Sequence, residues 1–253
     1  MHTLLHIYGP FAIHSYGFMI ALGLLLFMFL TRRDPRYTTL KLDAHFSMII
    51  AVGIIAAILG GRLLFFASYP DQIESVMQFF AFHEGGFSIL GAISAVVIAL
   101  PFYLKTIGVP IIPLLDLFAI YGPLLQSISR IGCFLAGCCY GLPTAQPWGI
   151  IYTDATTVAP LNVCMHPTQL YSAALLMLIF AFQYFIGRSI FKHTGQLLSS
   201  YLFLVAAERF IVDFWRGDRI VDGLHISINQ YVALAIMAAA CIGFLASRMA
   251  RKS

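Results

Sequence analysis

Seven long apolar stretches alternate with short polar segments along the chain, at approximately 13–30, 46–67, 87–104, 111–136, 168–187, 195–215 and 227–248. Each is close to the roughly 20 residues that an α-helix needs to cross a hydrocarbon core of about 30 Å. The stretches are continuous and do not alternate apolar with polar residues, so the strands of a membrane β-barrel do not fit them. The pattern therefore predicts an all-α, polytopic integral membrane protein with about seven transmembrane helices.

The ends of the first stretch bear on how the chain is organised. No lysine or arginine precedes this stretch, and Arg32 and Arg33 follow it, which is the reverse of a cleaved secretory signal peptide. We therefore expect the first helix to be retained. The chain has no internal repeat and no low-complexity linker, so residues 1–253 are predicted to form a single membrane domain.

The charge balance adds an orientation. Of the 253 residues, 60% are hydrophobic and only 10% are charged, and the mean hydropathy of +0.87 is far above that of a water-soluble domain. Cytoplasmic loops of membrane proteins carry an excess of lysine and arginine. One set of predicted helix ends holds Arg32, Arg33, Arg36, Lys41, Lys105, Arg188, Lys192, Arg248, Arg251 and Lys252, and the other set holds Arg216 and Arg219. This split predicts an N-terminus outside and a C-terminus in the cytoplasm, and it accounts for the net charge of +4 without a nucleic-acid partner.

Three arginines lie inside the predicted helices. Arg62, Arg130 and Arg209 fall in the second, fourth and sixth stretches, each roughly five or six residues before the outer end. A charged side chain near the centre of a bilayer costs at least about 2.5–3.5 kcal/mol, so such residues usually face a polar interior. Each could instead reach the headgroups, or pair with a carboxylate as Arg209 could with Asp213. Their shared depth predicts a site for the phosphate of an anionic lipid in the outer leaflet.

Other polar residues fall on the same side of the membrane. Gly85 and Gly86 precede Ser88 at the start of the third stretch, and paired glycines let a backbone approach a ligand at a helix N-terminus. His166 stands before the fifth stretch, where it could transfer a proton, face a headgroup or serve the structure alone. Tyr16, near the outer end of the first stretch, could position a headgroup or belong to the aromatic belt. Asp116, near an inner end, is expected to cap a helix or lie at the interface.

The outer side also collects four cysteines, Cys133, Cys138, Cys139 and Cys164. Because the outside is oxidising, a disulfide from Cys164 to Cys138 or Cys139 ranks first. A reactive thiol whose charge is stabilised by Arg130 ranks second. A zinc site ranks last, since the C-x4-C-C spacing is not a usual ligand pattern, and no metal is expected.

Taken together, these residues resemble one family, the prolipoprotein diacylglyceryl transferases of bacterial inner membranes. The matching segments are His14-Ser15-Tyr16-Gly17, Gly60-Gly61-Arg62, Gly85-Gly86-Phe87-Ser88, Arg130-Ile131-Gly132 with Phe134, His166-Pro167-Thr168-Gln169-Leu170-Tyr171, and Arg209-Phe210 with Asp213-Phe214 and Arg216. Their order, their spacing and the seven-helix topology agree over most of the chain. This agreement is more specific than any single segment.

The resemblance implies an enzyme that moves the diacylglyceryl group of phosphatidylglycerol onto the sulfur of a lipobox cysteine in a prolipoprotein signal peptide. The reaction would take place at the outer face of the bacterial cytoplasmic membrane, among membrane lipids and without a cofactor. Arg130 and Arg209 would hold the lipid phosphate and stabilise the departing charge, and His166 would be the third catalytic residue. The substrate-binding residues would be Tyr16, Arg62, Gly85, Gly86, Ser88, Gln169, Tyr171 and Asp213.

The chain departs from the family pattern where proton transfer is expected. Leu90 stands where a histidine usually follows the Gly-Gly-x-Ser stretch, and Cys133 and Cys138 fall in a signature that usually carries asparagines and a glutamate. The general base is therefore open between His166, Glu84, a cysteine and His83. Two alternatives remain: a paralogous transferase with the same lipid donor and another acceptor, and a membrane protein that binds anionic lipid without catalysis.

Overall fold

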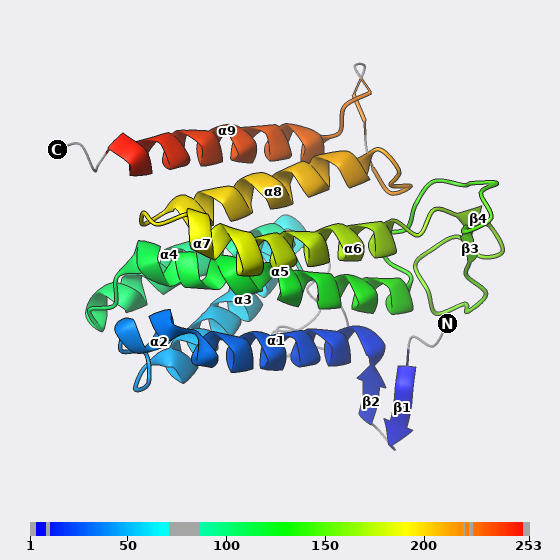
Figure 1. Cartoon of the computed structure of the whole chain (residues 1–253). Coiled ribbons are helices and arrows are strands. Elements are labelled where there is room, and N and C mark those ends of the chain that lie inside the picture. The colour runs from blue at the N-terminus through cyan, green and yellow to red at the C-terminus, as the bar shows by residue number, and fades with distance from the viewer. Residues whose placement is uncertain (1–3, 9–10, 71–86, 220, 223–224, 250–253) are drawn as a thin grey trace. The chain divides into compact units, whose positions relative to one another are not determined.

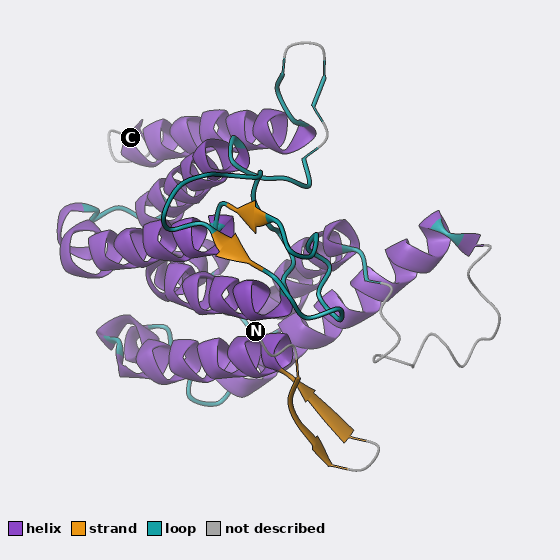
Figure 2. Cartoon of the chain, turned by 90° about the vertical axis from the view of Figure 1, so that its right-hand side faces the viewer, coloured by secondary structure: helices purple, strands orange, loops and turns teal. Residues whose placement is uncertain are grey.

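Helices dominate the computed structural model, which describes residues 4–8, 11–70, 87–219, 221–222 and 225–249 (Figure 1, Figure 2). The helices are α1 (Ser15–Arg33), α2 (Pro35–Thr39), α3 (Phe46–Ser68), α4 (Ile89–Thr106), α5 (Ile111–Ala136), α6 (Thr168–Ala181), the π-helix η3 (Phe182–Gly187), α7 (Arg188–Ile190), α8 (Gln196–Asp213) and α9 (Ile228–Met249). The strands are β1 (Leu4–Tyr8), β2 (Phe11–His14), β3 (Ile150–Ile151) and β4 (Cys164–Met165). The predicted all-α architecture is confirmed, and it includes two small sheets, β1-β2 and β3-β4, that the apolar pattern did not predict.

Six helical segments of the described chain are long and apolar enough to cross a membrane. They are α1, α3, α4, α5, the continuous segment Thr168–Ile190 and α9, and their bounds follow the predicted stretches closely. The chain is therefore a multi-pass membrane protein. The seventh predicted span corresponds to α8, which has 18 residues and carries three charged residues, Glu208, Arg209 and Asp213. Its crossing of the membrane, and the orientation of the termini, stay predictions.

The described chain divides into two compact units, of which residues 35–114 form one. In this unit α3 and α4 pack closely where Gly60 meets Gly91. A Cβ atom on Gly60 would lie 2.5 Å from the carbonyl oxygen of Gly91, and a Cβ atom on Gly91 would collide with the carbonyl oxygen of Gly60. The two glycines therefore let the helix backbones touch, as small residues do in membrane helix pairs.

The other unit comprises residues 1–34 and 115–253, and it carries α1, most of α5, and α6 to α9. Gly23 admits the side chain of Leu125, which brings α1 against α5. The last turns of α1 and α9 carry basic residues, and these turns lie at the same end of the unit as α7, which carries Arg188 (Figure 1). The basic residues of these helix ends are thus gathered at one end of the unit, as the charge count predicts.

Two side chains join the segments at this basic end. The carboxylate of Asp116 accepts hydrogen bonds from the N–H groups of Gly195 (2.6 Å) and Leu198 (2.8 Å). A carboxylate at a helix N-terminus satisfies free amides and opposes the helix dipole, so the predicted capping role of Asp116 is confirmed. The side-chain amide of Gln183, in the π-helix, donates to the carbonyl oxygen of Leu197 (3.1 Å). The irregular helix thereby fixes the start of α8.

The loop between α5 and α6, residues 137–167, lies at the opposite end of the unit (Figure 1). In it Ile150 pairs with Met165 and Ile151 with Cys164, in an antiparallel sheet of two strands. Tyr152 and Met165 are buried together with Ala159 in a small cluster. This packing gives the loop a fixed shape over the helix ends.

Candidate functional site

The end of α5 turns the chain back on itself. The N–H of Cys138 donates to the carbonyl oxygen of Cys133 (3.2 Å), and the N–H of Gly137 donates to that of Phe134 (3.3 Å). Gly137 has φ = +70°. This pair of hydrogen bonds around a left-handed glycine is the Schellman motif. It brings Cys138 next to Cys133 although four residues separate them.

Two residues in the first turn of α6 bind the backbone of Cys138 and Cys139, which end and follow this motif. The hydroxyl of Thr168 donates to the carbonyl oxygen of Cys139 (2.9 Å), and the side-chain amide of Gln169 donates to that of Cys138 (2.8 Å). Cys139 itself has φ = +60°, which few residues other than glycine adopt. The backbone of residues 137–139, here called the cysteine segment, is therefore fixed both by the end of α5 and by the start of α6.

Tyr152 supports the same segment from the loop. Its hydroxyl donates to the carbonyl oxygen of Phe134 (3.1 Å) and accepts from the amide of Gln169 (3.2 Å). Burial raises the pKa of Tyr152 to about 12. The phenol therefore keeps its proton at physiological pH and stays a hydrogen-bond donor.

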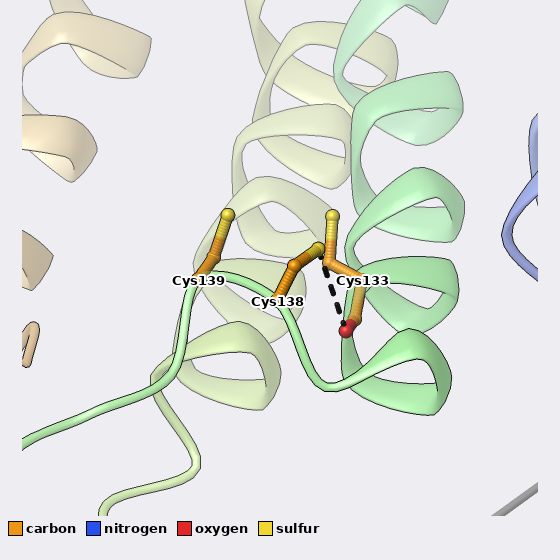
Figure 3. A group of neighbouring side chains, drawn as sticks. All are labelled: Cys133, Cys138 and Cys139. Atoms are coloured by element: carbon orange, nitrogen blue, oxygen red, sulfur yellow. Dashed lines mark hydrogen bonds between the residues drawn. The ribbon is translucent and has the colours of Figure 1, made fainter. Parts of the chain in front are cut away.

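Three thiols meet at this point: Cys133 from α5, and Cys138 and Cys139 from the segment after it (Figure 3). Their Sγ atoms all lie within 4.8 Å of one another, and Cys133 is buried. The neighbouring thiols of Cys133 and Cys138, and then the charges of Arg216 and Arg130, lower the pKa of Cys139. The same contacts with Cys133 and Cys139, together with burial, raise the pKa of Cys138. Within this segment a negative charge is therefore favoured on Cys139 and not on Cys138.

The predicted disulfide from Cys164 to Cys138 or Cys139 does not form here. All five cysteines, each of them in the described chain, are free thiols. The pairing of β4 with β3 holds Cys164 with its Sγ against Gly149. The residue that joins Cys138 and Cys139 is Cys133.

A second loop brings Arg216 to this end of the unit. The N–H of Leu142 donates to the carbonyl oxygen of Trp215 (2.8 Å), and the N–H of Gly217 donates to that of Tyr140 (2.9 Å). The guanidinium of Arg216 donates to both carboxylate oxygens of Asp218, at 2.9 and 2.6 Å. Although burial opposes its charge, these bonds and the nearby Cys139 raise the pKa of Arg216. Arg216 therefore stays a buried cation.

Three guanidinium groups share one electrostatic neighbourhood. The charges of Arg216 and Arg130 both act on Arg209. A guanidinium nitrogen of Arg209 also lies 4.0 Å from the fully buried carboxylate of Asp213, one turn along α8. Like charges repel at short range, so a cluster of three cations favours a further anion. Phosphate fits the planar donor fork of arginine.

Glu208 is the buried acid of this neighbourhood. It is 5% exposed, its carboxylate accepts a hydrogen bond from the hydroxyl of Ser172 in α6, and the charges of Arg130, Arg209 and Arg216 act on it. A buried carboxylate needs such partners. Glu208 thus balances part of the arginine charge and links α8 to α6.

His166 belongs to an aromatic group beside the cysteine segment. Its Nδ1 lies 3.1 Å from the hydroxyl of Tyr171, which also accepts a hydrogen bond from the indole of Trp148 (2.7 Å). The backbone N–H of His166 donates to the carbonyl oxygen of Leu142 (2.9 Å). His166 and Tyr171 therefore orient each other at the N-terminal end of α6.

Tyr16, in the first turn of α1, is 41% exposed and lies against Gly132 of α5. A Cβ atom on Gly132 would come within 3.3 Å of its ring. The charges of Cys133 and Arg130 reach its hydroxyl. Tyr16 therefore borders the arginine and cysteine clusters.

The remaining predicted residues belong to the unit of residues 35–114 or to the neighbouring part of the chain. Arg62 is buried, with its guanidinium 5.8 Å from the ring centre of Phe66. Ser88 caps α4 by accepting a hydrogen bond from the N–H of Gly91 (3.4 Å). Gly85 and Gly86 lie outside the described residues, as do Glu84 and His83. The predicted meeting of Arg62 with Arg130 and Arg209 stays a prediction.

Three members of the site have no predicted site role from the sequence. Arg216 enters there only as a loop charge and as part of a matching segment, Cys133 has no predicted partner, and Glu208 is not among the predicted residues. Glu208 had a signal, because an acid next to Arg209 inside an apolar stretch is as unusual as the arginine itself. Cys133 had one too, because Gly137 just after a predicted helix end marks a turn of the chain.

A family model described as prolipoprotein diacylglyceryl transferase matches residues 2–246. The phosphatidylglycerol–prolipoprotein diacylglyceryl transferase of Clostridium tetani is 37% identical to the chain over 88% of both proteins. The enzyme named phosphatidylglycerol–prolipoprotein diacylglyceryl transferase 2 from Clostridium perfringens is 34% identical over 89% of the chain and 87% of its own length. That of Dehalococcoides mccartyi is 32% identical over 94% of the chain and 90% of its own length.

Proposed function

Because the chain belongs to the prolipoprotein diacylglyceryl transferase family, we propose that it transfers the diacylglyceryl group of phosphatidylglycerol to the cysteine thiol of a lipobox. The proposed place is the outer face of the bacterial cytoplasmic membrane. The observation that carries the proposal is the cluster of Arg130, Arg209 and Arg216 at one end of a bundle of apolar helices. A phosphate ester of a membrane lipid is the anion that suits such a place.

The chemistry needs little beyond charge stabilisation and a thiolate. The acceptor sulfur attacks the glyceryl carbon that bears the phosphate, the new S–C bond forms, and the C–O bond breaks. Glycerol phosphate leaves with the electron pair of that bond, and the thiol proton goes to a base. Guanidinium donors aimed at the phosphate oxygens stabilise the departing charge.

Each predicted residue then has a role to test. Arg130 and Arg209 hold the phosphate, and Asp213 keeps Arg209 in place through the ion pair at 4.0 Å. Tyr16 borders the cluster from α1 and positions the headgroup. His166, oriented by Tyr171 at 3.1 Å, is a candidate proton carrier.

An apolar groove between α6 and α8 suits a lipid tail. Its lining residues are Leu175, Leu178, Ile179, Phe182, Leu204, Ala207, Glu208 and Ile211. Glu208 is the charged residue of this set, and it also belongs to the arginine neighbourhood. An acyl chain lying in the groove would therefore place its headgroup near the guanidinium groups.

The experiment is transfer of labelled diacylglycerol from phosphatidylglycerol to a lipobox peptide by the purified chain. Arg130→Ala is expected to lower the rate by at least about 100-fold, the scale of a lost transition-state donor. Arg248→Ala, in the last turn of α9, is the matched control and should leave the rate unchanged. Full activity of Arg130→Ala would contradict the proposal.

The same assay separates the two alternatives. A paralogue with another acceptor would consume phosphatidylglycerol in the presence of a membrane extract but leave the lipobox peptide unlabelled. A protein that only binds anionic lipid would neither consume phosphatidylglycerol nor label the peptide. Binding of phosphatidylglycerol that depends on Arg130, without any product, would favour the second alternative.

A further inference from the structure

The cysteine cluster has the composition and spacing of a metal site. Cys133, Cys138 and Cys139 each offer one sulfur, and the three Sγ atoms lie within 4.8 Å of one another. Two sulfurs bound to one tetrahedral Zn²⁺ at about 2.3 Å would lie roughly 3.8 Å apart. Side-chain rotation through about 1 Å is therefore enough to close the group around an ion.

The sequence spacing argued against zinc, and the fold removes that objection. The C-x4-C-C pattern is unusual for a ligand set in an extended chain. Here the Schellman turn at Gly137 returns Cys138 to Cys133. Thr168 and Gln169 then fix the carbonyl groups of Cys139 and Cys138 by hydrogen bonds. The backbone of the ligands is held before any ion arrives, which lowers the cost of ordering them.

The surrounding charge suits three thiolates and a divalent ion. Such a complex carries a net charge of −1, and an isolated buried charge is unfavourable. The charges of Arg216 and Arg130 both act on Cys139, and Arg130 lies one turn before Cys133 on α5. The cations that the phosphate requires therefore also balance the metal centre.

The ligand set leaves one position open. In the described chain the cluster contains the three cysteines and no histidine, aspartate or glutamate. Structural zinc sites use four protein ligands, whereas sites with three keep a position for water or substrate. Zn²⁺ has no redox chemistry, binds cysteine thiolates well, and takes the tetrahedral geometry that three protein ligands and one open position provide. It is the ion that fits a thiol site at an oxidising membrane face.

We propose that Cys133, Cys138 and Cys139 bind one Zn²⁺ ion, and that the acceptor thiol of the proposed transfer occupies its fourth position. The second half of this inference rests on the proposed function. A hydroxide on the ion takes the proton of the incoming thiol and leaves as water, so the sulfur binds as a thiolate. That thiolate attacks the glyceryl carbon while the C–O bond to phosphate breaks. The thioether product is neutral, so it is a weaker ligand and leaves the ion.

The first measurement is metal binding by the purified, reduced full-length protein. Zn²⁺ should bind at one ion per chain, and Co²⁺ in its place should give the thiolate charge-transfer and tetrahedral ligand-field bands. Cys138→Ser should lose both, and Cys164→Ser, from the same loop but outside the cluster, should keep both. Failure of the reduced wild-type protein to bind either ion would overturn the inference, as would binding that survives Cys138→Ser.

The second measurement adds a lipobox peptide to the Co²⁺ protein. A shift of the ligand-field bands is expected, and a peptide with serine in place of the lipobox cysteine should cause none. An unchanged spectrum with the cysteine peptide would overturn the acceptor role. This readout does not depend on turnover.

Activity then separates this inference from the proposed function. Removing the ion with a chelator should lower transfer by at least about 100-fold, the lower end of what thiol activation supplies, and Zn²⁺ should restore it. Full transfer by the metal-free protein would overturn the zinc mechanism and leave the proposed function standing. A bound ion that responds to the cysteine peptide in a protein that never transfers lipid would refute the proposed function and leave the metal site standing.

Discussion

Arg216 has two possible tasks that a pair of substitutions can separate. It is tied to Asp218 by two hydrogen bonds, and its charge also acts on Arg209. If it contacts the lipid phosphate, Arg216→Ala should raise the KM for phosphatidylglycerol by about 10-fold or more, because a hydrogen bond between charged groups contributes about 1.5–3 kcal/mol. Kinetics over a range of lipid concentrations measure this change.

Asp218→Asn is the matched control for Arg216. It removes the same ion pair but keeps the guanidinium, so its KM should change less than about threefold while the melting temperature falls as in Arg216→Ala. Equal effects of the two substitutions on KM would mean that Arg216 acts only through its ion pair.

Sequence alone identifies a functional residue when its signal does not depend on tertiary contacts. Arg130 and Arg209 stood out because charge inside an apolar stretch is costly wherever the helix lies. The cysteine partners depend instead on the path of a loop. Cys164 seemed the natural partner of Cys138 because both are on the outer side, but β-pairing with Ile151 holds Cys164 elsewhere.

At the scale of elements, the turn at the end of α5 builds the thiol cluster. Gly137 has φ = +70°, and a Cβ atom there would lie 2.6 Å from the Cβ atom of Thr157. Gly137→Ala should therefore cost at least the roughly 1–2 kcal/mol of a left-handed residue, and more from the contact. All three thiols remain in this variant. Its affinity for Co²⁺, measured by competition with a chelator, should fall at least about 10-fold because the ligands are displaced.

Gly108→Ala provides the control for backbone strain. Gly108 also has φ = +70°, but nothing lies within 4 Å of its added Cβ atom. This variant should lose a similar amount of stability to strain and keep the affinity for Co²⁺. Loss of affinity in both variants would indicate a general effect on folding rather than the turn at Gly137.

The helices themselves were predictable because apolar length is set by the bilayer and not by tertiary contacts. The predicted first stretch begins at residue 13, two residues before α1, because β2 continues to His14 and the helix begins at Ser15. The two sheets could not be predicted, since β3 and β4 have two residues each. Such short strands carry no periodic signal.

At the scale of the whole molecule, the open question is whether α8 crosses the bilayer. Its three charged residues set it apart from the six clearly apolar segments. Glu208 and Asp213 are nevertheless buried inside the protein, and Arg209 pairs with Asp213. Charges that face a protein interior do not prevent a helix from spanning a membrane.

The charge count makes this a sharp prediction. With seven spans, a reporter placed after Lys192 should be cytoplasmic, one after Asp218 should be outside, and one after Ser253 should be cytoplasmic again. Alkaline phosphatase, active only outside, and green fluorescent protein, fluorescent only in the cytoplasm, should give opposite results at each point. If the reporters after Lys192 and Asp218 report the same side, α8 does not cross. The arginine cluster would then combine residues from a spanning helix and a helix lying on one face, and the phosphate site would have to be reassigned to that face.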